Sequence, residues 1–323
     1  MAIISLLSLQ DAGTLSGSEI IPVNQAGTTK RAAVSAIAGR GVNSETQGEQ
    51  AIVLAGCNNK ALSSFGVVVQ GESNYVGGHV YNSILNGRYN TNLSIGYSTI
   101  IGGKNNLIAG CVATNQCSTI LNGANNSLSA GCASLLGGTN NTIFTPGNNN
   151  NIILGGNNGV ICNRNYSTSC NVILNGNNFI REGTGSVIGS GLINQTLHSG
   201  SSFIGAGSFN CILSSSCGFI GTGQGNKIIS GQKNIIVGGS GNNILSGSNG
   251  GIFGGINNGL SGNNSFVIGS GIKGCGDFTT FVNKLSATNS IHAGDGFTGT
   301  VTISSNEGDK SMIITDGIIT GLS

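Results

Sequence analysis

Carboxylates are the first side chains to examine for chemistry, because glycoside hydrolysis uses two carboxyl groups on either side of the scissile bond. Between residues 51 and 271 the only acids are Glu72 and Glu182, which are more than a hundred residues apart. We do not expect them to share a site within one chain, and only a contact between chains would bring them together. Solvated turn positions are the simpler interpretation of both.

The other residues with catalytic potential also lack the spacing that chemistry requires. His79, His198 and His292 belong to no recognisable catalytic motif. The glycine-rich run 221–225 resembles a phosphate-binding loop only in composition, because it does not open a helix. Acids near the C-terminus lie in glycine-rich turn contexts without the ligand spacing of a calcium loop; these are Asp295, Glu307, Asp309 and Asp316. The sequence therefore predicts neither enzyme activity nor a bound cofactor.

Nine cysteines are present, and their odd number and the lack of an export signal argue against a disulfide framework. Cys117, Cys132 and Cys170 each lie three residues before an apolar pair, so we expect buried thiols at an equivalent corner. Cys111 with Cys117, or Cys162 with Cys170, would be the candidates for a bridge or a metal. Neither pair has CxxC spacing or a nearby histidine, so we expect no metal site.

The elements that carry these residues follow from a short repeat between residues 51 and 271. Two adjacent apolar residues, usually followed by glycine or a small polar residue, recur fourteen times at steps of 14 to 20 residues. A second motif lies between many copies: asparagine, then one or two apolar residues, as in Asn105-Asn106-Leu107-Ile108. A short period of this kind is the signature of a stacked repeat. The copies end at Leu54, Val69, Leu85, Ile101, Leu121, Leu136, Leu154, Leu174, Ile188, Ile204, Ile220, Val237, Phe253 and Ile268.

Each repeat has room for two short strands and two turns, but not for a helix. Isoleucine, valine and phenylalanine favour strands, whereas glycine, asparagine and serine supply turns. The sequence predicts an all-β fold, a β-solenoid (a two-sided β-roll or a β-helix) of about 14 coils with about 16 residues each. A coil of that length favours the two-sided form over a three-sided one. We expect asparagines at equivalent corners to form ladders of side-chain amides along the stack.

The adjacency of the apolar residues predicts a partner. Neighbouring residues of a strand point to opposite faces, so each pair places an apolar side chain on both faces. A single thin coil has only one interior face. We therefore expect an obligate homo-oligomer, with a trimer as first choice; the alternative is that one member of each pair is simply exposed. The pairs selected as core and oligomer interface are Ile100, Ile101, Ile153, Leu154, Ile173, Leu174, Ile252, Phe253, Val267 and Ile268.

The overall composition excludes several classes of protein. Glycine accounts for 57 of 323 residues and charged residues for only 7%, but the regularly spaced apolar content of 38% indicates a packed rod rather than disorder. The net charge of +2 gives no reason to expect nucleic acid or an anionic membrane as a partner. No run of 18 apolar residues exists, so we expect no membrane insertion, and the first residues do not form a signal peptide.

The repeat is flanked by two segments without its rhythm. Residues 1–48 carry more charge, and 16–25 and 30–34 read as two strands joined by a turn. This segment is too small for a sufficient core, so we expect it to dock on another protein. Residues 49–273 form the shaft. In residues 274–323, strands at 278–282, 301–305 and 311–315 predict a small β module that caps the last coil.

The two ends and the middle together resemble appendage proteins of tailed bacteriophages. Residues 14–23 match the "G-x-E-x-x-P-V" pattern of their N-terminal segments, and a polar hairpin with basic residues follows. The middle looks like a trimeric β-solenoid shaft; it is also similar to the heads of trimeric bacterial adhesins, whose coils are shorter and more regular. The 20-residue steps before Leu121 and Leu174 depart from that pattern and imply bulged loops. The resemblance implies that the N-terminus docks on the virion through Glu19, Pro22, Lys30 and Arg31.

These observations lead to one expected function and three alternatives. We expect a non-enzymatic virion structural protein, a homotrimeric fibre or spike that is assembled in the host cytoplasm and can contact the host surface. A capsid-surface fibre or decoration protein would use the same docking segment. A glycan-degrading tailspike would need carboxylates that the shaft lacks, and a bacterial surface adhesin would need an export signal.

Overall fold

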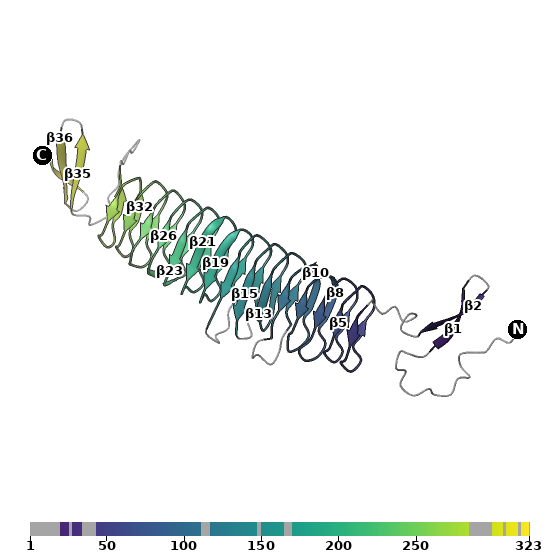
Figure 1. The fold of residues 1–323 in the computed structure, drawn as a ribbon. Helices are drawn as coiled ribbons and strands as arrows, with labels where there is room; N and C mark the ends of the chain where they lie inside the picture. The colour runs from purple at the N-terminus through teal and green to yellow at the C-terminus, as the bar shows by residue number, and fades with distance from the viewer. Residues whose placement is uncertain are drawn as a thin grey trace. The chain divides into compact units, whose positions relative to one another are not determined.

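The computed structural model describes residues 20–25, 28–33, 43–110, 117–146, 150–164, 170–283, 299–305, 308–315 and 318–322. All the regular secondary structure in these ranges consists of β-strands. Between residues 45 and 282 the chain forms a parallel β-solenoid in which successive strands alternate between two sheets (Figure 1). The predicted all-β solenoid is confirmed, and the coil is two-sided.

The two sheets have fifteen strands each, and we name them the β4 sheet and the β3 sheet after the first strand of each. The β4 sheet contains β4 (Ile52–Val53), β6 (Val67–Val68), β8 (Ser83–Arg88), β10 (Thr99–Lys104), β12 (Thr119–Ile120), β14 (Ala133–Leu135), β16 (Asn151–Ile153), β18 (Val172–Ile173), β20 (Val187–Ile188), β22 (Phe203–Ile204), β25 (Phe219–Ile220), β28 (Ile235–Ile236), β30 (Gly251–Ile252), β32 (Phe266–Ile268) and β34 (Thr280–Val282). These strands coincide with the apolar pairs of the repeat.

The asparagine motif of the repeat leads into the strands of the second sheet. The β3 sheet contains β3 (Glu45–Thr46), β5 (Lys60–Ala61), β7 (Tyr75–Val76), β9 (Thr91–Asn92), β11 (Leu107–Ile108), β13 (Ser127–Ala130), β15 (Thr142–Thr145), β17 (Val160–Cys162), β19 (Asn177–Arg181), β21 (Leu192–Leu197), β23 (Cys211–Leu213), β26 (Lys227–Ile228), β29 (Asn243–Ile244), β31 (Gly259–Leu260) and β33 (Lys273–Gly274). At one corner, β24 (Ser215–Ser216) and β27 (Gly231–Gln232) form a further short parallel pair.

The core lies between the two sheets, because each strand turns one apolar side chain inward. Ile100 and Ile120 of the β4 sheet and Ile108 and Leu128 of the β3 sheet are all fully buried. Burying one such side chain stabilises the folded chain by about 1.5–3 kcal/mol. The stack of coils therefore supplies a continuous, narrow core, although each strand is only a few residues long.

Asparagine ladders run along the stack at the corner that follows the β4 sheet. The Oδ1 atom of Asn106 accepts hydrogen bonds from the backbone N–H and from Nδ2 of Asn126, both at 3.1 Å. Asn126 repeats the contact with the backbone N–H of Asn141 at 3.0 Å. Its Nδ2 also donates to the carbonyl oxygen of Gly138, 3.1 Å away. The predicted amide ladders are confirmed.

The second asparagine of each doubled pair forms the ladder, whereas the first one forms the turn before it. Asn105, Asn125 and Asn140 have φ angles of 54°, 54° and 55°, in the left-handed region that asparagine tolerates better than most residues. They turn the chain so that the second asparagine points inward. The doubling of asparagine in the sequence therefore reflects two successive backbone positions with separate roles.

The longer steps of the repeat place their extra residues at the opposite corner. The chain between β11 and β12 and between β17 and β18 contains the residues added in the two 20-residue steps. The loops themselves, 111–116 and 165–169, lie outside the described residues. The strands on either side remain in parallel register, with Thr99 opposite Thr119 and Ile152 opposite Val172.

The terminal segments contain antiparallel strands. β1 (Ile20–Gln25) pairs with β2 (Thr28–Ala33), as the sequence predicted for this part of the chain. β35 (Gly299–Ser305) pairs with β36 (Gly308–Thr315), and β36 pairs with β37 (Ile318–Leu322), which confirms the C-terminal hairpin. By its internal contacts the chain divides into residues 1–281 and 282–323.

The last coil of the solenoid is covered by an aromatic side chain. Phe281 of β34 packs against the buried core, and its ring lies directly over Gly274 of β33, where a Cβ atom would come within 2.5 Å of the ring. Phe281 thus shields the final core residues from solvent. The role of residues 299–323 as a cap stays a prediction.

Candidate interface on the outer face of the β4 sheet

The apolar pairs of the repeat divide their side chains between the core and the outer face of the β4 sheet. Ile100 is fully buried, whereas Ile101 is 40% exposed. The same holds for the other selected pairs: Ile153, Ile173, Ile252 and Val267 are buried, and Leu154, Leu174, Phe253 and Ile268 are exposed. The geometry of a strand makes this unavoidable, because consecutive side chains point to opposite faces.

The exposed members form one apolar stripe along the solenoid, which we call the seam. Side chains at this position are between 37% and 53% exposed in the single chain. The seam residues are Leu54, Leu85, Ile101, Leu121, Leu136, Leu154, Leu174, Val237, Phe253 and Ile268. Contiguous exposed apolar surface of this kind marks an interaction site in soluble proteins.

Three coils have glycine at the seam position, Gly189, Gly205 and Gly221, and the last two of these coils carry a phenylalanine two residues earlier. Gly205 and Gly221 occupy seam positions where a Cβ atom would approach the next coil's carbonyl oxygen to 2.4 Å. Phe203 and Phe219, two residues earlier, extend their rings towards these glycines, and the two rings stack with centroids 5.3 Å apart. The apolar surface therefore continues through this region. Here it is formed by the residue before the buried isoleucine, whereas in the other coils it is formed by the residue after it.

The pattern differs at these coils from the one that the sequence suggested. The apolar pairs ending at Ile188, Ile204 and Ile220 place their second residue in the core, so the outward member is the first: Val187 is half-buried, and Phe203 and Phe219 are exposed. The register between coils does not change, since Ile173 is opposite Ile188; glycine replaces the outward residue that follows, so the apolar pair is formed with the residue before. The distinction is visible in the sequence only as "apolar-Ile-Gly" in place of "Ile-apolar-Gly".

Charge separates the two outer faces of the solenoid. From Ile52 to Ile268, the two positions that flank each buried residue of the β4 sheet contain no charged side chain. The corresponding outer positions of the β3 sheet include Lys60, Arg181, Lys227 and Lys273. An uncharged apolar face opposite a charged face is the arrangement expected when only one face is covered by a partner.

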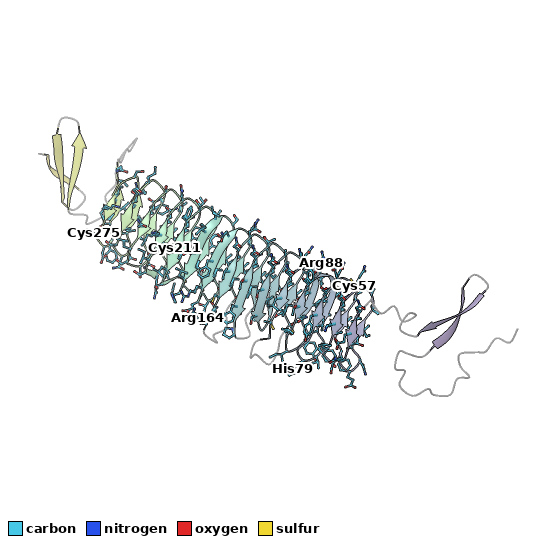
Figure 2. All side chains as sticks on the ribbon, viewed as in Figure 1. Cys57, His79, Arg88, Arg164, Cys211 and Cys275 are labelled. Carbon is cyan, nitrogen blue, oxygen red and sulfur yellow. The ribbon has the colours of Figure 1, made fainter. Side chains whose placement is uncertain are left out.

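The two glutamates of the shaft, Glu72 and Glu182, each form an ion pair with a residue of the next coil. The Oε2 atom of Glu72 is 2.9 Å from Nε of Arg88, and this carboxylate raises the pKa of Arg88 above its usual value. Figure 2 shows Arg88 and His79 at opposite edges of the solenoid. Because the two side chains are exposed, this pair contributes little to stability.

Glu182 forms a similar pair on a later coil. Its Oε2 atom lies 2.7 Å from Nδ1 of His198, and Nε of Arg181 is 3.9 Å from its other oxygen. Ser214 follows on the next coil, which gives the order of groups found in serine hydrolases. Among the described side chains, however, no hydrogen bond joins the Ser214 hydroxyl to His198. The cluster is better understood as a link between coils, and it is not shared with Glu72.

The prediction of buried thiols at the corner before the β4 sheet is wrong for the single chain. Cys117 and Cys170 are exposed, and Cys132 is half-buried. Each directly precedes a buried residue, Ser118, Asn171 or Ala133, so the inward position belongs to the next residue. Cys211 is a more buried thiol, and that burial raises its pKa.

The predicted docking residues lie on the N-terminal hairpin. Pro22 is opposite Arg31, and Val23 is opposite Lys30 in the ladder of β1 and β2. Glu19 lies outside the described residues. Their role in docking on a virion stays a prediction.

Comparison with known proteins does not name a family. No protein-family model and no curated protein sequence matches the chain. Within the described ranges, no three His, Cys, Asp or Glu residues are grouped closely enough to hold a metal ion. The same ranges contain no helix that is long and apolar enough to cross a membrane.

Proposed function

We propose that this protein is a non-enzymatic structural fibre whose solenoids associate through the seam into a homotrimer. The observation that supports this proposal is the continuous, uncharged apolar face of the β4 sheet. Its side chains are about half exposed in one chain, and their burial would add a second core parallel to the first.

The parallel arrangement of the copies follows from the proposed role. A fibre that docks by one end needs all its N-termini at that end, which cyclic symmetry about the long axis provides. Three copies around such an axis bring each seam against two others, as in a triangular prism. We propose a trimer on this ground.

The setting that best fits this fibre is the virion of a tailed bacteriophage. The support is the N-terminal pattern with Glu19, Pro22, Lys30 and Arg31, followed by a hairpin and a long solenoid. In this proposal the N-terminal segment docks on other virion proteins and the shaft projects towards the host surface. Attachment to the capsid as a decoration fibre uses the same features, and labelling the protein on intact particles distinguishes the two positions.

The oligomer is tested with two matched substitutions. Leu154→Lys changes a seam residue that is 42% exposed, and Phe144→Lys changes an outward residue of the β3 sheet that is 47% exposed. In sedimentation equilibrium we expect the unaltered protein and Phe144→Lys to have three times the chain mass. Leu154→Lys should shift towards the monomer, because a lysine in a covered apolar face leaves a charge without solvent.

Two outcomes contradict the proposal. A monomeric unaltered protein at micromolar concentration removes the proposed interface. Loss of host polysaccharide on incubation with the purified protein would contradict the non-enzymatic role and would favour a glycan-degrading spike.

A further inference from the structure

Cys117 and Cys132 occupy matching positions on neighbouring coils. In the β4 sheet, Thr119 of β12 lies opposite Ser134 of β14. The backbone N–H of Cys117 donates to the carbonyl oxygen of Gly131 at 3.0 Å, which continues the same register two residues earlier. Stacked positions in a parallel sheet are about 4.8 Å apart, within the Cα separation that a disulfide spans.

The two thiols are neighbours on adjacent coils and are accessible from solvent. Burial raises the pKa of the Cys117 thiol, and the nearby Cys132 side chain raises it further. Cys117 is exposed and Cys132 half-buried, and both line a surface pocket of about 230 Å³ together with Asn150 and Asn151. A small thiol reagent can therefore reach the pair from outside.

This arrangement is specific to one pair of cysteines. Eight cysteines lie in the described ranges, and the other six have different residues at the matching positions of the neighbouring coils. Cys162, for example, is opposite Phe144 and Arg181. Among the described cysteines, only Cys117, before β12, and Cys132, before β14, therefore lie opposite each other on neighbouring coils.

We propose that Cys117 and Cys132 form an intrachain disulfide that joins two neighbouring coils when the protein meets a small-molecule disulfide such as oxidised glutathione. This proposal depends on the register of the coils and not on the proposed oligomer or virion role.

The exchange proceeds in two balanced steps. The thiolate of Cys117, the more exposed residue, attacks one sulfur of oxidised glutathione; the S–S bond breaks and one glutathione thiolate leaves, taking a proton from solvent. The thiolate of Cys132 then attacks the mixed disulfide at the Cys117 sulfur and displaces the second glutathione. Two cysteine S–H bonds and one S–S bond become one S–S bond and two S–H bonds, so two electrons pass to glutathione.

The rate of this exchange should depend on pH. Burial raises the pKa of Cys117, and the neighbouring Cys132 raises it further. The thiolate is therefore a small fraction at neutral pH, and disulfide formation should accelerate about tenfold per pH unit until that pKa is reached.

The test uses the full chain, incubated with oxidised glutathione at pH 8, quenched by alkylation and mapped by peptide mass spectrometry. We expect a peptide pair joined through Cys117 and Cys132, and an upward shift of Tm by roughly 5–10 °C relative to the reduced protein. Cys117→Ser and Cys132→Ser should each lose both the linked peptide and the shift. Cys162→Ser, on a coil without a matching cysteine, should retain them.

Three outcomes overturn the proposal. One is full alkylation of Cys117 and Cys132 after oxidation. Another is a bridge from Cys117 to Cys111 instead. The third is a Cys117 or Cys132 bridge between chains, seen as a band of higher mass on a non-reducing gel. If a serine variant fails to fold, the peptide map of the unaltered protein decides alone.

Discussion

At the residue scale, most buried polar side chains of the solenoid are paired, and Asn92 shows how. Asn92 occupies a position of the β3 sheet that is isoleucine or valine in the neighbouring coils, yet it is fully buried. Its Nδ2 donates to the carbonyl oxygen of Ser98 at 2.8 Å, and its Oδ1 accepts from the backbone N–H of Ser94 at 3.3 Å. Ser94 and Ser98 are joined through their hydroxyls at 2.7 Å. The polar groups thus satisfy one another inside the stack.

Thr196 is the contrasting case and leads to a prediction. It is fully buried between Ile180 and Ile212, and its hydroxyl has no hydrogen-bond partner within the described part of the chain. Thr196→Val keeps the shape and removes the unpaired group, so it should raise the free energy of unfolding by about 1–2 kcal/mol. Chemical denaturation of both proteins measures the difference.

The control for this substitution is Asn92→Val, which removes a paired polar group from an equivalent position. It should lower the free energy of unfolding, because the Ser94 N–H and the Ser98 carbonyl lose their partner. If both substitutions change stability in the same direction, the assigned difference between the two sites is wrong.

At the scale of the element, each turn is stabilised by the coil beside it. The corner before the β4 sheet stacks the rings of Phe65, Tyr81 and Tyr97, with centroids 4.7 and 5.1 Å apart. All three residues have φ angles between 51° and 58°, which costs energy for an aromatic residue. Stacking between successive coils offsets this cost, as the asparagine ladder does at the other corner.

The turn of the last coil predicts a dependence on pH. The backbone N–H of Asn263 donates to Oδ1 of Asp277 at 2.7 Å, and its Nδ2 donates to both carboxylate oxygens. These bonds lower the pKa of Asp277, the backbone bond most strongly. The contribution to stability is therefore complete above the ordinary Asp pKa of about 3.9 and is lost as the pH falls through the lower, folded value.

Asp277→Asn separates this contribution from other acid effects. We expect its Tm to lie below that of the unaltered protein at pH 7, and the two values to converge once the pH has fallen below the lowered pKa of Asp277. Thermal unfolding between pH 7 and pH 2.5 tests the expectation. A constant difference across this range would show that the charge of Asp277 does not matter.

At the scale of the whole molecule, the two members of one apolar pair should respond differently to protein concentration. Ile173→Ala removes a buried core side chain and should lower the free energy of unfolding by about 2–5 kcal/mol at any concentration. Leu174→Ala removes a seam side chain. Its effect should be small in the dissociated chain and should grow as the concentration rises, because association and folding are then linked.

Thermal unfolding over a hundredfold range of concentration distinguishes the two responses. The Tm of the unaltered protein should rise with concentration, and Leu174→Ala should weaken that slope while Ile173→Ala preserves it. A Tm independent of concentration in all three proteins would contradict association through the seam.

The sequence alone determined the fold class and favoured the two-sided coil that the structure shows. Adjacent apolar residues at a period near 16, separated by glycine and asparagine, allow only short stacked strands, and doubled asparagine specified the ladders. Local chemistry decides these features, because each coil repeats the same contacts with its neighbour.

Only the tertiary structure decided which residues of different coils meet. The steps of the repeat vary between 14 and 20 residues while the strands keep their parallel register, so equivalent positions cannot be read from spacing alone. Register brings Cys117 beside Cys132 and stacks Phe203 on Phe219. It also turns Cys117 and Cys170 outward, against the sequence prediction. The physical reason is that the side-chain period of a strand is two, and a shift of one residue exchanges core for surface.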